Sequence, residues 1–237
     1  MTSKSNHLPA ATTMHTTMLQ WLGISIRGVM RTRHGAIRLV LLVLIALVSM
    51  ADPSIATFGP FEQTASSLAP PGAEHYFGTD NVGRDIFSMV IYGTRASLAI
   101  GFGAAFAALI IGGTIGILAG YFGGWVESVL MRVTELFQTL PVILFVLLAV
   151  ALFGSSFWLL IAAVTLAIWP VEARLIYGQY LKLRNREFVA AARVIDLSTT
   201  HIVLREILPN AIQPVIVQVA LDASVAILIE AGLGFLG

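Results

Sequence analysis

Two long runs without a charged residue constrain the fold of this chain more than any other feature. Ala96–Trp125 has 30 residues and Leu136–Val171 has 36. A helix rises 1.5 Å per residue and must cross a hydrocarbon core of about 30 Å, so the first run suits one tilted transmembrane helix and the second suits two. The whole chain is 57% hydrophobic and 11% charged. This composition excludes a soluble domain and predicts a polytopic, all-α membrane protein.

Several functional classes are excluded or disfavoured. The chain has no cysteine, so disulfides, thiolate metal sites and cysteine nucleophiles are excluded, and its net charge of +1 gives no support for nucleic-acid binding. No G-x-x-x-x-G-K-[ST] phosphate loop occurs, and Gly154-Ser155-Ser156 lacks the second glycine of a hydrolase elbow. We therefore expect no catalytic, cofactor or metal site in this chain.

Five transmembrane spans are expected. The break inside the second uncharged run is placed at Gly154-Ser155-Ser156, where turn-forming residues gather, and Pro141 and Pro170 are expected to kink the helices on either side. The expected spans are Ala36–Ala51, Ala96–Trp125, Val133–Phe153, Phe157–Tyr180 and Ala211–Ile229.

Charge asymmetry predicts the orientation of these spans. Four arginines precede or begin the first span without an acid among them, so the N-terminus should be cytoplasmic. We expect a cytoplasmic tail and basic flank over 1–35 and a transmembrane domain over 36–237. Within that domain the loop 52–88 should be external and the loop 181–210 cytoplasmic. Five spans leave the two ends on opposite sides, and a sixth span would bring the C-terminus back inside.

The cytoplasmic segment Arg184–Asn210 is charged and rich in helix formers between two apolar runs. It is predicted to form two short helices, with Leu197–Thr200 as the turn and Pro209 closing the second helix. A membrane protein that keeps such a segment in water is expected to contact a partner with it, and small alanine side chains would allow a close approach.

Two features inside the spans are candidates for packing or transport. One is a glycine at every fourth position, which suits close helix contact either within this chain or between subunits. The other is Asp222 at membrane depth, which would either contact a passing substrate or form an interhelical hydrogen bond to a neighbouring subunit. The glycines are Gly112, Gly116, Gly120 and Gly124.

The loop 184–210 resembles the cytoplasmic EAA loop of binding-protein-dependent ABC transporter permeases. Ala190, Ala191 and Ala192 occupy the EAA positions, Asp196 occupies the glycine, and Leu208-Pro209 forms the ending. The resemblance implies that the helix around Phe188–Leu197 docks in a groove of an ATPase subunit. The residues implied in this coupling are Glu187, Ala190, Ala191, Ala192, Arg193, Asp196, Leu197, Leu208 and Pro209.

The segment before the second span is similar to the HxFGTDxxGRD signature of C-type permeases of dipeptide, oligopeptide and nickel importers. A turn-forming role is favoured over ligand contact because no nucleophile and base are present. Thr79 and Asp80 are expected to cap a helix, Arg84 or Asp85 to pair locally, and His75 to be exposed. The signature residues are His75, Gly78, Thr79, Asp80, Gly83, Arg84 and Asp85.

The resemblance implies a type I ABC importer permease fold with six spans in the full protein. It implies a permease subunit that moves short peptides across the bacterial cytoplasmic (inner) membrane by alternating access. Its partners would be a second homologous permease in a heterodimer, ATP-binding subunits that hold ATP and magnesium, and an extracytoplasmic substrate-binding protein. The alternatives are a permease for nickel or another small solute, or an ion-coupled secondary transporter that uses Asp222 and Glu172.

Overall fold

The computed structural model describes residues 33–50, 55–64 and 66–236. In this part of the chain every regular element is helical, apart from two isolated β-bridges that pair Gln63 with Arg84 and Thr79 with Asp85. The predicted all-α fold is therefore confirmed. The chain forms two compact units, one ending at Ile55 and the other beginning at Ala56.

The first unit contains one described helix, α2, Arg33–Met50. Its apolar stretch His34–Ser49 is shorter than a full span, and it corresponds to the first predicted span. Leu42, Leu44 and Leu47 are all more than half exposed, as expected of a helix whose surroundings are lipid. Most of the tail predicted for 1–35 lies outside the described residues.

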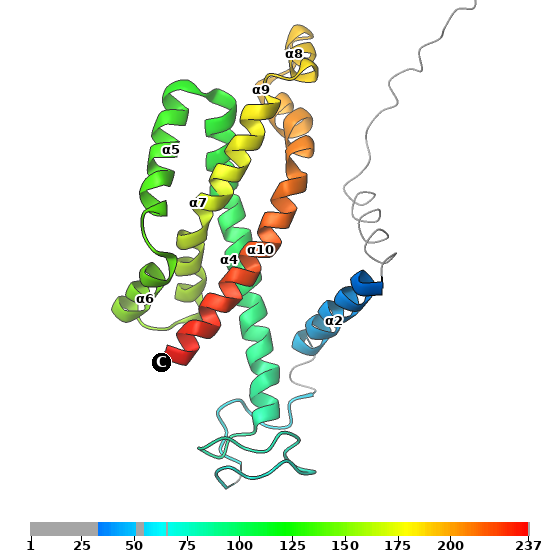
Figure 1. Cartoon of the computed structure of the whole chain (residues 1–237), viewed down its shortest axis with the longest axis vertical. Helices are drawn as coiled ribbons and strands as arrows, with labels where there is room; N and C mark the ends of the chain where they lie inside the picture. The colour runs from blue at the N-terminus through cyan, green and yellow to red at the C-terminus, as the bar shows by residue number, and fades with distance from the viewer. Residues whose placement is uncertain (1–32, 51–54, 65, 237) are drawn as a thin grey trace, which may run out of the picture. The chain divides into compact units, whose positions relative to one another are not determined.

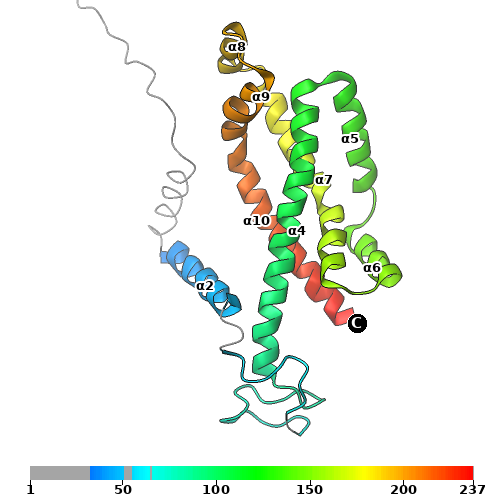
Figure 2. The ribbon, with the colours of Figure 1, turned by 180° about the vertical axis from the view of Figure 1, so that it is seen from behind.

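The second unit is a helical bundle in which α4, α7 and α10 run side by side (Figure 1). The segment 56–85 lies at one end of the bundle and the short helix α8 at the opposite end, as the reverse view also shows (Figure 2). Its helices are α4 Ile86–Phe122, α5 Gly124–Gln138, α6 Val142–Phe153, α7 Phe157–Leu183, α8 Glu187–Val194, α9 Thr199–His201, a π-helical segment Ile202–Ile207, and α10 Leu208–Leu236.

Among the described residues, three helices are long and apolar enough to cross a membrane: α4, α7, and the continuous helix Thr199–Phe235 that ends in α10. They correspond to three of the five predicted spans. Asp85 starts α4 ten residues before Ala96, because its carboxylate accepts a hydrogen bond from the Ser88 amide at 2.8 Å. The described part of the chain is thus that of a multi-pass membrane protein.

The third predicted span is broken into α5 and α6, whose axes differ by 77°. Pro141 lies directly before α6 in an extended conformation and lacks the amide hydrogen that a continuous helix would need there. The kink expected at this proline is therefore present. The break expected at Gly154–Ser156 is also confirmed, because Gly154 has a φ of +88° and the Ser156 hydroxyl caps α7.

Three of the four glycines in the predicted stripe lie where α4 contacts α7. A Cβ added to Gly112 would be 2.8 Å from the Ala173 nitrogen, and one added to Gly120 would be 2.5 Å from the Cβ of Tyr180. A Cβ added to Gly116 would likewise lie 2.9 Å from the Cβ of Ile176. Only a glycine leaves room for the backbones to approach this closely.

Gly124 is an exception to the stripe. It lies beyond the end of α4, with a φ of +57° and no other atom within 4 Å of an added Cβ. It forms the tight turn into α5 together with Gly123, so its role is conformational freedom rather than helix packing.

Gly112→Ala and Gly116→Ala are each expected to destabilise the folded protein by about 1–3 kcal/mol, because the added methyl must displace backbone atoms of α7. The thermal unfolding midpoint in detergent measures this. Gly113→Ala is the matched control, since its Cβ would meet the Ile176 side chain at an ordinary 3.5 Å. Equal midpoints for Gly112→Ala and Gly113→Ala would contradict the packing argument.

Candidate functional site

Helix α8 presents a small, apolar surface to solvent at the tip of the bundle. Its Val189 and Ala192 are buried against the cluster that holds Tyr180 and Ile207. Ala190 and Ala191 are exposed, and Val194 and Ile195 are 85% and 70% exposed. The exposed residues Ala190, Ala191, Val194 and Ile195 are called the α8 face below.

The alanines at the EAA positions therefore divide between two environments. Ala190 and Ala191 belong to the α8 face, whereas Ala192 is 5% exposed and supports the helix from below. The sequence pattern does not separate these roles, because all three side chains are the same. Only Ala190 and Ala191 can meet a partner directly.

Asp196 ends α8 in the left-handed conformation, with a φ of +58°. The Leu197 amide donates to the Ala192 carbonyl at 3.1 Å, and the Asp196 amide donates to the Arg193 carbonyl at 3.0 Å. These two bonds form a Schellman motif, in which glycine is the usual residue at the position of Asp196. Aspartate thus adopts the backbone geometry of a glycine, and Leu197 still packs on the cluster below α8.

Polar contacts attach the α8 region to both α4 and α7. The Arg184 guanidinium donates to the Gly120 carbonyl at 3.0 Å, and the Arg193 guanidinium lies 5.9 Å from the centre of the Tyr121 ring. The Tyr180 hydroxyl donates to the Val203 carbonyl at 3.0 Å. Arg193 therefore contacts an aromatic ring of α4, a cation–π contact that sequence spacing did not reveal. Glu187 is exposed in the first turn of α8.

The prediction that Pro209 closes the second short helix is wrong. The chain is helical from Thr199 to Phe235, and Pro209 is the second residue of α10. The π-helical segment Ile202–Ile207 comes directly before it. Its wider turn gives the proline ring room where an α-helical carbonyl four residues earlier would clash. Leu208 packs against the cluster below α8.

His75 is buried in the segment 56–85, so its expected exposure is wrong. Its Nδ1 lies 3.0 Å from the Asp85 carboxylate, its ring lies 5.1 Å from that of Phe58, and only 8% of the residue is exposed. The Ser88 hydroxyl also accepts from the Phe58 amide at 3.2 Å. His75 and Ser88 thus connect the loop to the start of α4.

Asp85, rather than Thr79 or Asp80, caps a helix. Thr79 instead bridges the loop, because its hydroxyl donates to the Ser66 carbonyl and accepts from the Ala69 amide, both at 2.8 Å. Asp80 accepts from the Arg84 amide at 2.9 Å and from its guanidinium at 2.8 Å. The Arg84 amide first, and then the Val82 amide and the Arg84 side chain, hold the pKa of Asp80 below its usual value.

The remaining signature residues are turns. Gly78 and Gly83 have φ values of +74° and +81°, which favour glycine. A Cβ on Gly78 would also collide with the Ala69 carbonyl. The signature residues therefore build the loop and the start of α4.

Asp222 is buried between helices and does not line an open surface of this chain. It is 4% exposed, and one of its carboxylate oxygens accepts from the Gln218 amide at 2.8 Å. It faces Glu172 of α7, which is fully buried. Sequence reasoning considered both residues singly but did not predict that they meet.

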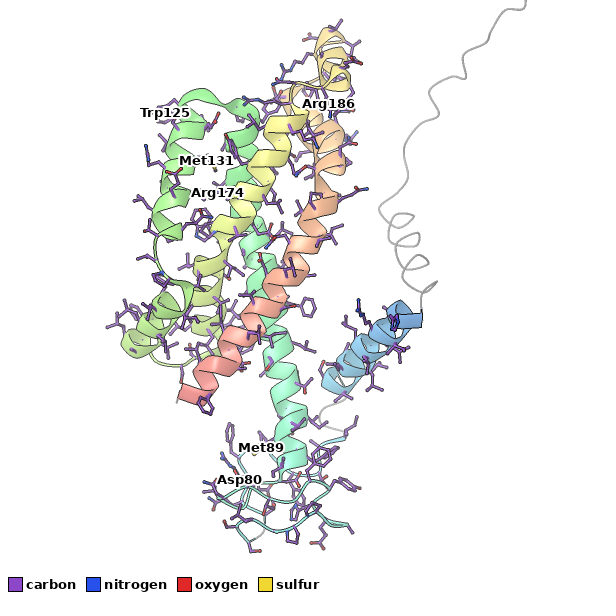
Figure 3. All side chains as sticks on the ribbon, in the orientation of Figure 1. Asp80, Met89, Trp125, Met131, Arg174 and Arg186 are labelled. Carbon is purple, nitrogen blue, oxygen red and sulfur yellow. The ribbon has the colours of Figure 1, made fainter. Side chains whose placement is uncertain are left out.

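A polar cleft of about 520 Å³ lies between α5 and α7. Met131 and Arg174 lie between these helices (Figure 3). One wall is fixed by the Tyr177 hydroxyl, which donates to Glu127 at 2.6 Å. The cleft is also lined by Ser128, Arg132 and Glu135.

Comparison with known proteins finds one matching family model and several similar permeases. The family model described as binding-protein-dependent transport system inner membrane component matches residues 112–237. The chain is 36% identical over 208 residues to the dipeptide transport system permease protein DppC of Alkalihalophilus pseudofirmus, covering 87% of this chain and 68% of that protein.

Two proteins of Bacillus subtilis are also similar. Its dipeptide transport system permease protein DppC is 36% identical over 200 residues, covering 84% of this chain and 62% of that protein. Its oligopeptide transport system permease protein OppC is 32% identical over 214 residues, covering 89% and 70%. The chain therefore spans about two thirds of the length of these relatives.

Asp196→Gly is expected to stabilise the protein by up to about 1 kcal/mol, because glycine adopts a positive φ without a Cβ penalty. Asp196→Val should destabilise it, since a branched side chain tolerates this backbone poorly. Thermal unfolding midpoints of the two variants and the unmodified protein test this. A lower midpoint for Asp196→Gly would mean that the aspartate side chain makes a stabilising contact.

Asp85→Asn is expected to weaken the pH dependence of stability in acid. Burial alone would raise the pKa of Asp85, but hydrogen bonds from Ser88 and His75 outweigh it and hold the pKa below its usual value. The ionised form therefore stabilises the loop fully above about pH 4, and this contribution is lost as the pH falls through the folded-state pKa.

As the pH is lowered from about 7 to about 3, the thermal unfolding midpoint should fall more steeply for the unmodified protein than for Asp85→Asn. Glu74→Gln is the control, because Glu74 is an exposed acid of the same loop. Parallel profiles for the unmodified protein and Asp85→Asn would exclude this role.

Proposed function

The chain belongs to the family of binding-protein-dependent transport system inner membrane components, and from this membership we propose that it is the permease subunit of an ATP-driven importer of short peptides. The peptide class is supported by the names of the similar permeases, which refer to dipeptides and oligopeptides. Their names favour peptides over nickel or another small solute as cargo.

The observation that carries the proposal is the α8 face. Ala190 and Ala191 are small and exposed, while Val189 and Ala192 hold the same helix on the bundle. An exposed apolar surface at the tip of a membrane protein marks a contact site. We assign the α8 face to a groove of an ATP-binding subunit, which would hold the ATP and magnesium.

The contacts below α8 supply a mechanical route to the spans. A push on α8 would pass through Val189 and Ala192 to the π-helical segment, and through Arg193 to Tyr121 of α4. Closely packed α4 and α7 would then move together rather than deform. This arrangement supports alternating access driven by nucleotide-dependent closure of the partners.

The charges support one orientation of the chain in the membrane. The α8 end carries Lys182, Arg184 and Arg186, which supports a cytoplasmic location for it. The segment 56–85 would then face outward, where an extracytoplasmic substrate-binding protein would deliver cargo. A second, homologous permease would complete the translocation path.

An ion-coupled secondary transporter was the other candidate. It would use Asp222 and Glu172 as ion sites, but it gives no reason for the exposed α8 face. Membership of a family of binding-protein-dependent systems favours the ATP-driven importer instead.

Ala191→Trp is expected to reduce binding of the ATP-binding subunits by at least tenfold. The indole ring would occupy the space through which the groove of the partner must approach α8. Affinity purification of the complex and its peptide-stimulated ATPase activity measure this. Thr200→Trp is the control, since Thr200 is exposed in the same loop but outside α8.

Ala192 is unsuitable for this test, because a larger side chain there would disrupt the core under α8. Normal recovery of the ATP-binding subunits with Ala191→Trp would exclude α8 as their docking helix. Transport that persists without ATP and stops when the proton gradient is removed would exclude the importer altogether.

A further inference from the structure

Two acidic side chains meet in the buried interface of α7 and α10. Glu172 is 0% exposed and Asp222 is 4% exposed, and their carboxyl groups interact across the interface. Gln218, one turn before Asp222 on α10, donates to one Asp222 oxygen at 2.8 Å. Among the described residues, no other residue outside the pair donates a hydrogen bond to either carboxyl group.

Three oxygens of the pair lack a donor. They are both Glu172 carboxyl oxygens and the second Asp222 oxygen. A buried carboxylate that accepts no hydrogen bond and has no cation beside it is strongly unfavourable. Two such carboxylates facing each other would add mutual repulsion, so the pair cannot be stable with both groups ionised.

No other charged side chain among the described residues of the second unit compensates for the pair. The facing position of α4 is Gly112, where an added Cβ would touch the Cβ of Glu172. Arg95 of α4 is 17 positions away from Gly112, or about 25 Å along the helix. Arg174 is exposed and lies two positions from Glu172, so it points away from it. Gln218 is neutral.

One shared proton removes the mutual repulsion and pairs two of the three oxygens that lack a partner. An ionised carboxylate only accepts hydrogen bonds, whereas a protonated carboxyl group also donates one. A proton on Glu172 would let it donate to the free Asp222 oxygen, while Gln218 holds the other oxygen. The remaining negative charge would then be shared over a short, charge-assisted hydrogen bond.

We propose that Glu172 and Asp222 form a proton-binding site that shares one proton in the folded protein and thereby joins α7 to α10. These two helices flank the loop that carries α8. The site itself does not depend on the proposed function. The consequence of the site does rest on the proposed function: the two spans on either side of the ATPase-docking loop would move as one body.

Infrared spectroscopy of the purified complex detects the proton directly. At neutral pH the unmodified protein should show the carbonyl band of a protonated, buried carboxyl group, and the double variant Glu172→Gln/Asp222→Asn should lose it. Glu135→Gln should keep the band, because Glu135 is an exposed acid paired with Arg132 at 3.2 Å. Absence of the band from the unmodified protein, as a bound cation would cause, or its persistence in the double variant, overturns the proposal.

The pH dependence of thermal stability is a second measurement. The unfolded chain releases this proton at about pH 4, whereas the folded pair would still hold it at neutral pH, so this contribution to stability should fall as the pH rises above about 4. Glu172→Gln should remove this fall and keep the unfolding midpoint at neutral pH, because its amide can donate to Asp222 without a proton to lose. Glu172→Ala should lower the midpoint. An equally steep fall in Glu172→Gln would overturn the proposal, and neither measurement requires transport or ATPase activity.

Discussion

The close approach of α4 and α7 is the contact on which the rest of the second unit depends. Lipid offers apolar helices no hydrophobic reward for associating, so their packing relies on short van der Waals distances. Gly112, Gly116 and Gly120 provide these distances over two turns of α4. The same contact places Gly120 where its carbonyl accepts from Arg184 at the start of the α8 loop. Helix packing in the membrane and the position of the loop in water are therefore coupled.

The α8 region shows how a short helix can be held rigidly without a large core of its own. A helix of eight residues is unstable alone, and α8 is fixed by burial of Val189 and Ala192, by the Arg193 contact with Tyr121, and by the Schellman turn at Asp196. Each of these contacts comes from a different part of the chain. A partner that binds the exposed side of α8 would meet a helix whose position is already determined.

Sequence alone predicts the features that depend on composition and on local backbone preference. The two uncharged runs give α4 and α7, and the apolar stretch 211–229 gives α10, because lipid favours long apolar helices. The turn residues at Gly154–Ser156 give the break before α7. The burial of His75 was not predictable in this way. It depends on Asp85 and Phe58, and contacts between residues ten or more positions apart leave no local pattern. Pro209 was misjudged for a similar reason, since a π-helical turn before it is not visible in the sequence.

The pairing of Glu172 with Asp222 marks the limit of such reasoning and also its physical interest. Each acid alone suggests a functional site in a membrane helix, and sequence reasoning left open whether Asp222 contacts substrate or forms an interhelical hydrogen bond. The two carboxyls lie together in a dry interface and beside Gly112, where their pairing would hold α7 against α10. A leucine pair could fill the same space, but it would not fix the register of α7 against α10. A single hydrogen bond between the two carboxyl groups would fix this register, because any sliding of one helix along the other would leave a buried carboxyl without a partner. The polar pair thus trades stability for a unique alignment of the two helices that enter and leave the α8 loop.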